Sequence, residues 1–215
     1  MKSLALLGAS GHGKVVADIA EQLGYQTIHF YDDAHPSITK LEVWDVVGTT
    51  KDLLENSHEY DGCCITIGAN RIREQKYQQL KQANMVFPTL IHPSAVVSRH
   101  ATVHEGSVVM ANAVINIAAK VGVGCIVNTG ATIDHDCKID NFVHISPSAA
   151  LAGNVSIGDY SWVGIGAAVK QGVTIASNVM VGAGASVITN INTNETVVGV
   201  PAKTKTSTVL GNNHA

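Results

Sequence analysis

The sequence predicts an α/β domain with a parallel sheet, followed by a parallel β-helix built from six-residue repeats. Two observations predict this combination. Strand and helix patterns alternate through the first 90 residues, and from Ile91 onward an aliphatic residue stands at every sixth position. We therefore expect an α/β domain at residues 1–90, a β-helix at 91–190 and a C-terminal tail at 191–215.

The composition is that of a folded protein with few charges. Hydrophobic residues fill 46% of the 215 positions, and charged residues fill 14%, which excludes a disordered chain. The net charge of −3 provides no basic field, so we expect no nucleic-acid partner. No apolar run reaches the roughly 18 residues of a membrane span, so we expect no transmembrane segment.

The four cysteines show no pattern typical of a metal site or a disulfide framework. Cys63, Cys64, Cys125 and Cys137 form no CxxC pair and have no histidine at zinc spacing. We interpret them as reduced thiols, expect no metal, and expect the protein to be cytoplasmic.

The elements of the first 90 residues follow in order. The apolar run Ser3–Leu7 predicts a strand, and the amphipathic segment after Gly8 predicts a helix that ends near Leu23. Further strands are predicted at 26–31, 46–47 and 63–67, and helices at 51–56 and 70–84. This alternation favours a Rossmann-like parallel sheet.

A glycine-rich loop, Gly8 to Gly13, joins the first strand to the first helix. Its order is G-x-x-G-x-G rather than the dinucleotide pattern. It also matches the P-loop spelling through Lys14, but Val15 stands where a hydroxyl would hold Mg²⁺, which argues against a nucleoside triphosphatase. A loop at a helix N-terminus is a general anion and nucleotide site. A tight turn without a ligand is the alternative interpretation.

Two aspartates strengthen the nucleotide interpretation. Asp32 and Asp33 directly follow the second predicted strand, where a carboxylate can accept hydrogen bonds from a ribose or a base. The carboxyl ends of parallel strands share one edge of the sheet, so we expect the aspartates to lie beside the glycine loop.

The second half is dominated by an unbroken six-residue period. A helix cannot keep such a stripe on one face, because six is not a multiple of 3.6. Short strands joined by corners can keep it, and three hexads then close one triangular coil, so that residues eighteen apart stack. The seventeen inward aliphatic residues are Ile91, Val97, Val103, Val109, Ile115, Val121, Val127, Ile133, Ile139, Ile145, Leu151, Ile157, Val163, Val169, Ile175, Val181 and Val187.

Two further columns of the hexads fit this coil. One column holds small or β-branched residues and includes Cys125 and Cys137, which we interpret as core residues rather than nucleophiles. The other is mostly glycine or asparagine, which tolerate the positive φ of a sharp corner. Its members are Gly106, Asn112, Gly124, Gly130, Asn154, Gly166, Gly172, Asn178, Gly184 and Asn190.

Two histidines of the repeats stand out. His135 occupies an outward position in the segment Ile133-Asp-His-Asp-Cys137, and Asp136 follows it at a corner. A neighbouring carboxylate raises the basicity of an imidazole, although Asp136 also fits as a plain turn residue. His144 lies nine residues on, one and a half hexads away, and therefore elsewhere on the coil.

Taken together, these motifs resemble one family of enzymes. The GASGHG loop, the two aspartates, the IGAN turn at 67–70, the segment Asp134-His-Asp-Cys137 and the segment Gly199-Val-Pro-Ala-Lys203 occur in one chain. The combination is similar to the hexapeptide-repeat sugar O/N-acyltransferases, and most of all to the bacillosamine-pathway (PglD-like) N-acetyltransferases. The resemblance covers about residues 3 to 203. It implies a left-handed β-helix, a homotrimer, and acetyl-CoA bound in the groove between adjacent prisms.

The resemblance also implies an activity and a set of site residues. It implies transfer of the acetyl group from acetyl-CoA to the 4-amino group of a UDP-linked 4-amino-4,6-dideoxy-sugar, directly and without a metal. His135 matches the general base, and Asp136 stands where close relatives have a longer glutamate. The positions that match substrate-binding residues are Ser10, Gly11, His12, Asp32, Asp33, Gly68 and Asn128. Those that match acetyl-CoA-binding residues are His144, Ile165, Gly166, Gly182 and Ala183. Ile165 and Ala183 are eighteen apart, so the period independently stacks them.

Several alternatives stay open at this point. A sialic acid O-acetyltransferase and an N-acetyltransferase for a GDP-linked sugar such as perosamine share the same chemistry. A non-catalytic β-helix binding protein is the alternative of a different class, although such a solenoid needs neither His135 with Asp136 nor the glycine loop. A sugar nucleotidyltransferase would require a much larger N-terminal domain. The sequence does not identify the sugar or its C2 and C6 substituents.

Overall fold

A five-stranded sheet forms the centre of the N-terminal part of the computed structural model, which describes residues 2–205. The strand order is β3-β4-β2-β1-β5, and all pairs are parallel except β3 with β4. The strands are β1 (Ser3–Leu7), β2 (Thr27–Tyr31), β3 (Lys40–Leu41), β4 (Trp44–Gly48) and β5 (Gly62–Ile65). The helices are α1 (Gly11–Gln22), α2 (Thr50–Glu55) and α3 (Asn70–Gln82), with a 3₁₀ turn at Ser57–Glu59.

The predicted parallel sheet is confirmed, and the edge strand β3 is a feature that the sequence pattern missed. Lys40 and Leu41 pair with Asp45 and Trp44 across a tight hairpin, with Glu42 in the left-handed region at φ 54°. Two residues are too few to show an alternating pattern. The other predicted elements are present, with ends that differ by a few residues.

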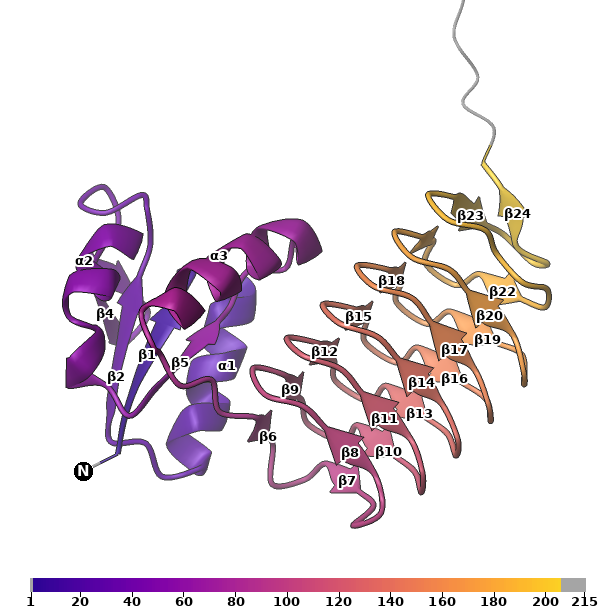
Figure 1. Ribbon diagram of the computed structural model, residues 1–215, viewed down its shortest axis with the longest axis horizontal. Coiled ribbons are helices and arrows are strands. Elements are labelled where there is room, and N and C mark those ends of the chain that lie inside the picture. Colours follow the sequence, from indigo (N-terminus) through magenta and orange to yellow (C-terminus); the bar gives the residue numbers. More distant parts are fainter. Residues whose placement is uncertain (1, 206–215) are drawn as a thin grey trace, which may run out of the picture.

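The helices cover both faces of this sheet (Figure 1). Apolar residues of α1 pack on one face, and Leu53 of α2 with Tyr77 and Leu80 of α3 pack on the other. Both apolar clusters continue into the second half of the chain, through Met110 on the α1 side and Phe142 on the α3 side. The α/β domain therefore shares its core with the first coils of the β-helix.

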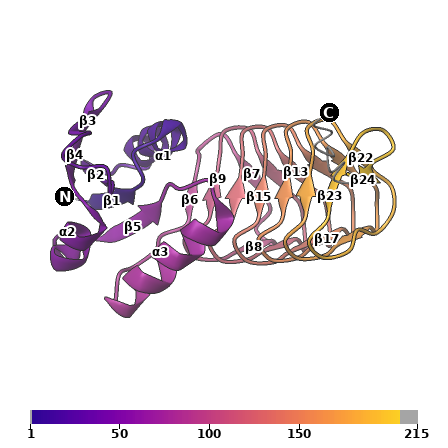
Figure 2. The same ribbon diagram turned by 90° about the horizontal axis from the view of Figure 1, so that it is seen from above.

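The second half is a three-sided prism of stacked two-residue strands, seen from above in Figure 2. We name its sheets by their first strands. The β7 sheet contains β7 (Val96–Val97), β10 (Val114–Ile115), β13 (Thr132–Ile133), β16 (Ala150–Leu151), β19 (Ala168–Val169) and β22 (Ser186–Val187). The β8 sheet contains β8 (Thr102–Val103), β11 (Lys120–Val121), β14 (Lys138–Ile139), β17 (Ser156–Ile157) and β20 (Thr174–Ile175). The β6 sheet contains β6 (Leu90–Ile91), β9 (Val108–Val109), β12 (Ile126–Val127), β15 (His144–Ile145), β18 (Trp162–Val163), β21 (Met180–Val181), β23 (Thr196–Val198) and β24 (Lys203–Thr204).

The packing inside the prism confirms the six-residue period. All seventeen predicted aliphatic residues belong to one apolar cluster, and fourteen of them are at most 3% exposed. Ile91, Val97 and Val103 are only partly buried, because they lie in the first coil. Cys125 and Cys137 are buried in the same cluster, as predicted.

The corner residues are in the conformation that the glycine and asparagine column predicts. Nine of its ten members have positive φ, and Asp136 joins them at φ 62°. Asn190 is not among them. The coil shortens there, since Ile175 pairs with Ile191, sixteen residues on, rather than eighteen. Of the predicted tail at 191–215, residues 196–204 carry β23 and β24 on the β6 sheet, while 206–215 lie outside the described residues.

A buried arginine joins the two parts of the chain. Arg73 on α3 is 2% exposed, and its five N–H groups donate five hydrogen bonds of 2.7–3.1 Å. No carboxylate accepts any of them, and burial lowers the pKa of the guanidinium to about 10. The acceptors are the side-chain oxygen of Asn70 and the carbonyls of Ile67, Gly68, Gly124 and Phe142. One side chain thus connects the loop after β5 to two successive coils.

We expect Arg73→Met to lower the free energy of unfolding by about 3–5 kcal/mol, because it leaves buried carbonyl groups without donors. Arg73→Lys keeps the charge but supplies at most three donors, so it should also destabilise. Arg71→Met on the same helix is the matched control, since Arg71 is exposed and its guanidinium stacks on the ring of Tyr160. Denaturant titration measures all three, and equal stability of the Arg73→Met and Arg71→Met variants would contradict this role.

Candidate active site

His135 lies at the edge between the β7 and β8 sheets, and three polar neighbours fix its position. Its side chain is 51% exposed. Its Nδ1 lies 2.8 Å from Oδ2 of Asp136, and its backbone N–H donates to Oδ1 of Asp134 at 2.8 Å. The Asn116 amide, one coil earlier, donates to that same oxygen of Asp134 at 2.8 Å. The imidazole therefore projects from a corner with a defined conformation.

The contact with Asp136 determines which nitrogen of the neutral His135 ring carries the proton, and it also shifts the pKa of the ring. The ionised carboxylate accepts the Nδ1–H, which leaves the lone pair of Nε2 free. The hydrogen bond to Asp136, followed by the charge of Asp134, raises the pKa of His135 above its ordinary value. The shorter aspartate therefore reaches the imidazole, a point that the sequence left open.

Gly153 makes room for this imidazole. It lies eighteen residues after His135, one coil further along the prism. A Cβ at Gly153 would lie 2.5 Å from Cε1 and 2.6 Å from Nε2 of His135, closer than real Cβ contacts. Sequence reasoning missed Gly153, although the eighteen-residue period would have found it.

His144 occupies a different place, on the outer face of the β6 sheet. His144 is 7% exposed, and its ring packs on Trp162 with 4.0 Å between ring centroids. The Asn128 amide nitrogen lies 3.1 Å from Nε2 of His144, and the Asn128 oxygen accepts the backbone N–H of Thr129. Nε2 is therefore the acceptor, and the proton of the neutral ring is on Nδ1. That buried Nδ1 has no partner among the described residues.

His12 of the glycine loop faces the same region. Its Nε2 is likewise buried without a partner in the described part of the chain. Burial, with a smaller effect of Arg73, lowers the pKa of His12 to about 4. Burial, Arg73 and His12 lower the pKa of His144 to about 3. Two neutral imidazoles from different domains thus each present an unpaired nitrogen where the domains meet.

A mostly apolar groove of about 450 Å³ extends from this junction along the β6 sheet. Ile165 and Ala183 both line the groove, in agreement with the stacking that their eighteen-residue separation predicts. Gly182 also lines it, whereas Gly166 does not. The lining residues are Asn128, His144, Ser146, Pro147, Trp162, Gly164, Ile165, Met180, Val181, Gly182 and Ala183.

The predicted loop residues lie at the carboxyl edge of the sheet. Ser10 precedes α1 and donates to the Thr66 carbonyl at 3.4 Å. Gly11 opens α1 with open space around it. Gly68 lies next to the ring of Trp162, so the loop after β5 borders the groove.

Both predicted aspartates have partners within the chain. One oxygen of Asp32 accepts the backbone N–H of Ala9 at 2.8 Å, which fixes the glycine loop. Asp33 accepts the backbone N–H of Thr50 at 2.8 Å and pairs with Lys76 at 2.7 Å. Lys76 holds the pKa of Asp33 down, at about 2. Binding of a nucleotide by either carboxylate stays a prediction.

His135 and the groove do not meet within one chain. His135 lies at the edge between the β7 and β8 sheets. His144 lies on the β6 sheet, and Ile165 lies in the turn from that sheet to the β7 sheet. The predicted site residues therefore form two groups on different edges of the prism.

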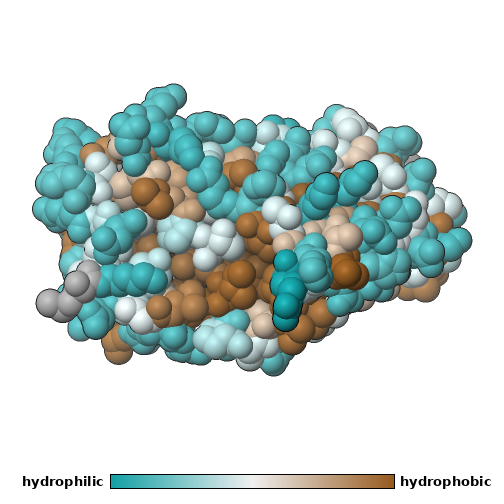
Figure 3. All heavy atoms as spheres, turned by 60° about the horizontal axis from the view of Figure 1, so that its bottom comes forward, coloured by the Kyte–Doolittle hydropathy of each residue, from teal (hydrophilic) through white to brown (hydrophobic). Residues whose placement is uncertain are grey.

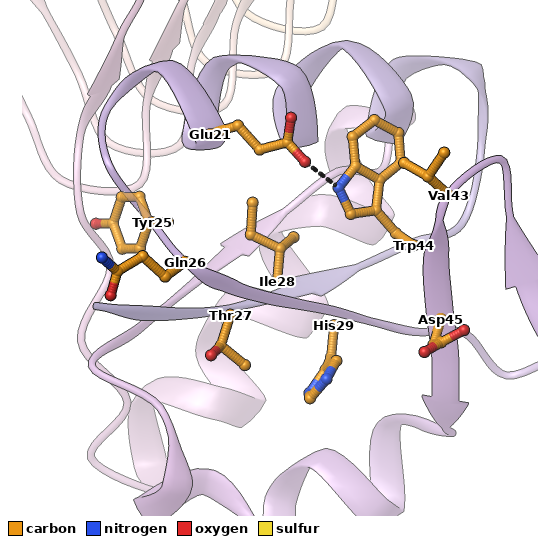
Figure 4. Close-up of a pocket in the computed structure, with 9 residues that line it drawn as sticks. All are labelled: Glu21, Tyr25, Gln26, Thr27, Ile28, His29, Val43, Trp44 and Asp45. Atoms are coloured by element: carbon orange, nitrogen blue, oxygen red, sulfur yellow. Dashed lines mark hydrogen bonds between the residues drawn. The ribbon is translucent and has the colours of Figure 1, made fainter. Parts of the chain in front are cut away.

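A separate hollow of about 330 Å³ lies at the other end of the α/β sheet (Figure 4). It is bordered by the amino ends of β2 and β4, where the Trp44 Nε1 donates to Glu21 at 2.9 Å. Ligands of parallel α/β sheets bind at the carboxyl ends. It contains none of the predicted site residues.

Two negative findings concern residues 2–205. No group of three or more histidine, cysteine, aspartate or glutamate residues there has the geometry of a metal site. No helix in this range is long and apolar enough to cross a membrane.

A β-helix bearing an outward histidine–carboxylate pair and an apolar groove defines an acyltransferase of the hexapeptide-repeat class. The family profile described as the PglD N-terminal domain matches residues 3–80. The acetyltransferase domain of PglB from Neisseria gonorrhoeae is 46% identical, with 95% of this chain and 100% of that one covered and a TM-score of 0.91. The chain belongs to this PglB/PglD-type family of acetyltransferases, and the predicted fold class is confirmed.

Two further relatives differ in the substrates that their names give. PerB from Caulobacter crescentus, solved with CoA and GDP-perosamine, is 34% identical over 96% of this chain and 98% of that one, with a TM-score of 0.91. The UDP-N-acetylbacillosamine N-acetyltransferase of Bacillus subtilis (strain 168) is 36% identical over 114 residues. The match spans about half the length of this curated relative, 52% of each chain.

We expect Asp136→Ala to lower the pKa of His135, because the substitution removes the acceptor that favours the imidazolium. NMR titration of the His135 ring should show its midpoint moving to lower pH, toward the ordinary value. Asp45→Ala, at an exposed aspartate of the α/β domain, is the control and should leave the midpoint in place. An unchanged midpoint in Asp136→Ala would contradict the contact.

Proposed function

We propose that the protein transfers the acetyl group of acetyl-CoA to the 4-amino group of a UDP-linked 4-amino-4,6-dideoxy-sugar. The observation that carries the proposal is the half-exposed His135 side chain, whose Nδ1 is held by Asp136 so that Nε2 is left to accept a proton. The name of the Bacillus subtilis relative supports a bacillosamine-type sugar. The structure of the related PglB domain in complex with acetyl coenzyme A supports the acyl donor.

The groove on the β6 sheet fits an acyl-CoA arm. Its lining needs a glycine at position 164, since a Cβ there would lie 2.6 Å from the Val181 carbonyl oxygen. Ile165 and Met180, which also line it, are exposed apolar residues. Such a surface suits a long, weakly polar chain. The buried Nδ1–H of His144 would supply a hydrogen-bond donor at its inner end.

The proposed reaction is a direct transfer. Nε2 of His135 accepts the proton that the amino group loses as its nitrogen bonds to the thioester carbon. As the bond from that carbon to sulfur breaks, the imidazolium returns the proton to the sulfur, and CoA leaves as the thiol. Asp136 stabilises the transient positive charge on His135.

A GDP-linked amino sugar is the second candidate. PerB, at 34% identity over nearly the whole chain, was solved with GDP-perosamine. Asp32 and Asp33 lie where a carboxylate suits uridine without excluding guanosine, and the same reaction chemistry serves both sugars.

The assembly we propose is a homotrimer with shared sites. Because His135 and the groove occupy different edges of the prism, one chain does not bring base and acyl donor together. The outward positions of the β7 sheet are small or apolar and include Val96, 63% exposed. Apolar surface gathers in the middle of the face turned forward in Figure 3. Packing of three copies around this sheet would bring His135 of one subunit to the groove of the next.

The activity is tested by measuring thiol release from acetyl-CoA with a panel of UDP- and GDP-linked amino sugars. We expect turnover with a UDP-4-amino sugar, and a kcat lower by two to four orders of magnitude in His135→Ala, roughly the effect of losing a general base. Nucleotide-sugar binding should survive that substitution. Near wild-type turnover in His135→Ala would contradict the assigned base, and no turnover with any sugar would contradict the function.

The shared site is tested by mixing two inactive subunits. His135→Ala removes the base, and Ile165→Arg fills the groove with a charged side chain. Trimers that carry both subunit types, purified through two different tags, should regain about one active site in three, because a single interface then pairs two intact halves. Sedimentation should give a mass near three times 22.5 kDa. Absence of any recovery in mixed trimers would contradict the shared site.

A further inference from the structure

Two lysines stack on the outer face of the β8 sheet. Lys120 and Lys138 are direct partners in the parallel pairing of β11 with β14, and neighbouring strands lie about 4.8 Å apart. Both side chains are exposed, and among the described residues neither forms an ion pair or a side-chain hydrogen bond. Like charges directly opposite each other in a sheet are destabilising. A bound anion would remove that repulsion.

The sheet around these lysines is hollowed. Three adjoining hollows of about 520, 350 and 270 Å³ lie on it, and Lys138 lines all three. Gly122 and Gly158 carry no side chain that could fill these hollows. A larger residue does not fit at either position, since its Cβ would lie 2.5–2.7 Å from the backbone of the next coil. Asp136 and Asp140 line parts of these hollows, but neither pairs with a lysine.

The largest of these three hollows reaches Asp136, the carboxylate bonded to the candidate base. Asp136, which holds His135, lines it together with both lysines. Lys138 follows His135 by three residues, a separation of at most about 10 Å between Cα atoms. Any group that the lysines bind is therefore close to the group on which His135 acts.

We propose that Lys120 and Lys138 bind the diphosphate of the nucleotide sugar. This inference rests on the proposed function, in which His135, at the edge of the β8 sheet, meets the groove of the next subunit. Both substrates carry a diphosphate, and ammonium groups bind phosphate as point charges. Only a pyranose ring separates the amino group from the sugar diphosphate, whereas the whole pantetheine arm separates the thioester from that of CoA. The position beside His135 therefore favours the nucleotide sugar.

Steady-state kinetics of the double variant Lys120→Met/Lys138→Met test the inference. We expect the KM for the nucleotide sugar to rise roughly tenfold or more, with kcat and the KM for acetyl-CoA unchanged, because binding lost equally in ground and transition states raises KM alone. Lys138→Arg should retain most of the affinity. Lys170→Met is the matched control, because Lys170 is an exposed lysine next to the β7 sheet with no ion pair among residues 2–205.

The outcomes show whether the lysines bind the diphosphate of the nucleotide sugar or that of CoA. An unchanged KM for the nucleotide sugar overturns the inference, and so does a rise confined to the KM for acetyl-CoA, which would assign the lysines to CoA. Calorimetric titration with UDP, with uridine and with CoA gives a reading that does not need turnover. If the wild-type enzyme acetylates no amino sugar, the proposed function fails, but weaker UDP binding with unchanged uridine and CoA binding in the double variant still supports the lysines. Equal affinity for UDP in the wild-type enzyme and the double variant overturns the inference.

Discussion

Each side chain of this β-helix is constrained by the residues eighteen positions before and after it. The inward aliphatic column leaves no freedom of register, because a shift by one residue would turn the buried column outward. His135 keeps its orientation because Gly153 lies beneath it, and His144 stays buried because its pairing partner, Trp162, packs against its ring. The same stacking creates the ridge of Ile165 and Ala183 and places Lys120 opposite Lys138. The positions of these site residues therefore follow from the eighteen-residue stacking of the coils.

The junction with the α/β domain depends on Arg73, a buried charge that no carboxylate neutralises. A carboxylate would add negative potential to a cleft in which a diphosphate is proposed to bind, whereas carbonyl acceptors leave the positive potential in place. That potential also contributes to keeping His12 and His144 neutral. The residue that fixes the domain arrangement thus also sets the electrostatics of the cleft.

The sequence was informative wherever the interaction was periodic or local. The hexads predicted the prism, the buried Cys125 and the stacked Ile165 and Ala183. Adjacency in the chain drew attention to Asp136 beside His135, although the sequence left open whether the shorter aspartate reaches the ring. Contacts between distant segments were beyond such reasoning. Arg73 meets carbonyls up to 69 residues away, and no local pattern marks it. The carboxylates of Asp32 and Asp33 were predicted near the glycine loop, but their bonds to Ala9 and Lys76 depend on how strands and helices pack.

The histidines show how environment divides chemical roles. His135 is half-exposed and hydrogen-bonded to a carboxylate, which raises its pKa above the ordinary value and suits it to accept a proton. His12 and His144 are buried near a cation, and with pKa values of about 4 and 3 they stay neutral. In the proposed transfer only His135 changes its protonation state, while the Nδ1–H of His144 remains a fixed donor. Because the proton acceptor is on one edge of the prism and the fixed donors are on another, acetyl transfer would require the meeting of two subunits. Assembly would then be part of the catalytic mechanism.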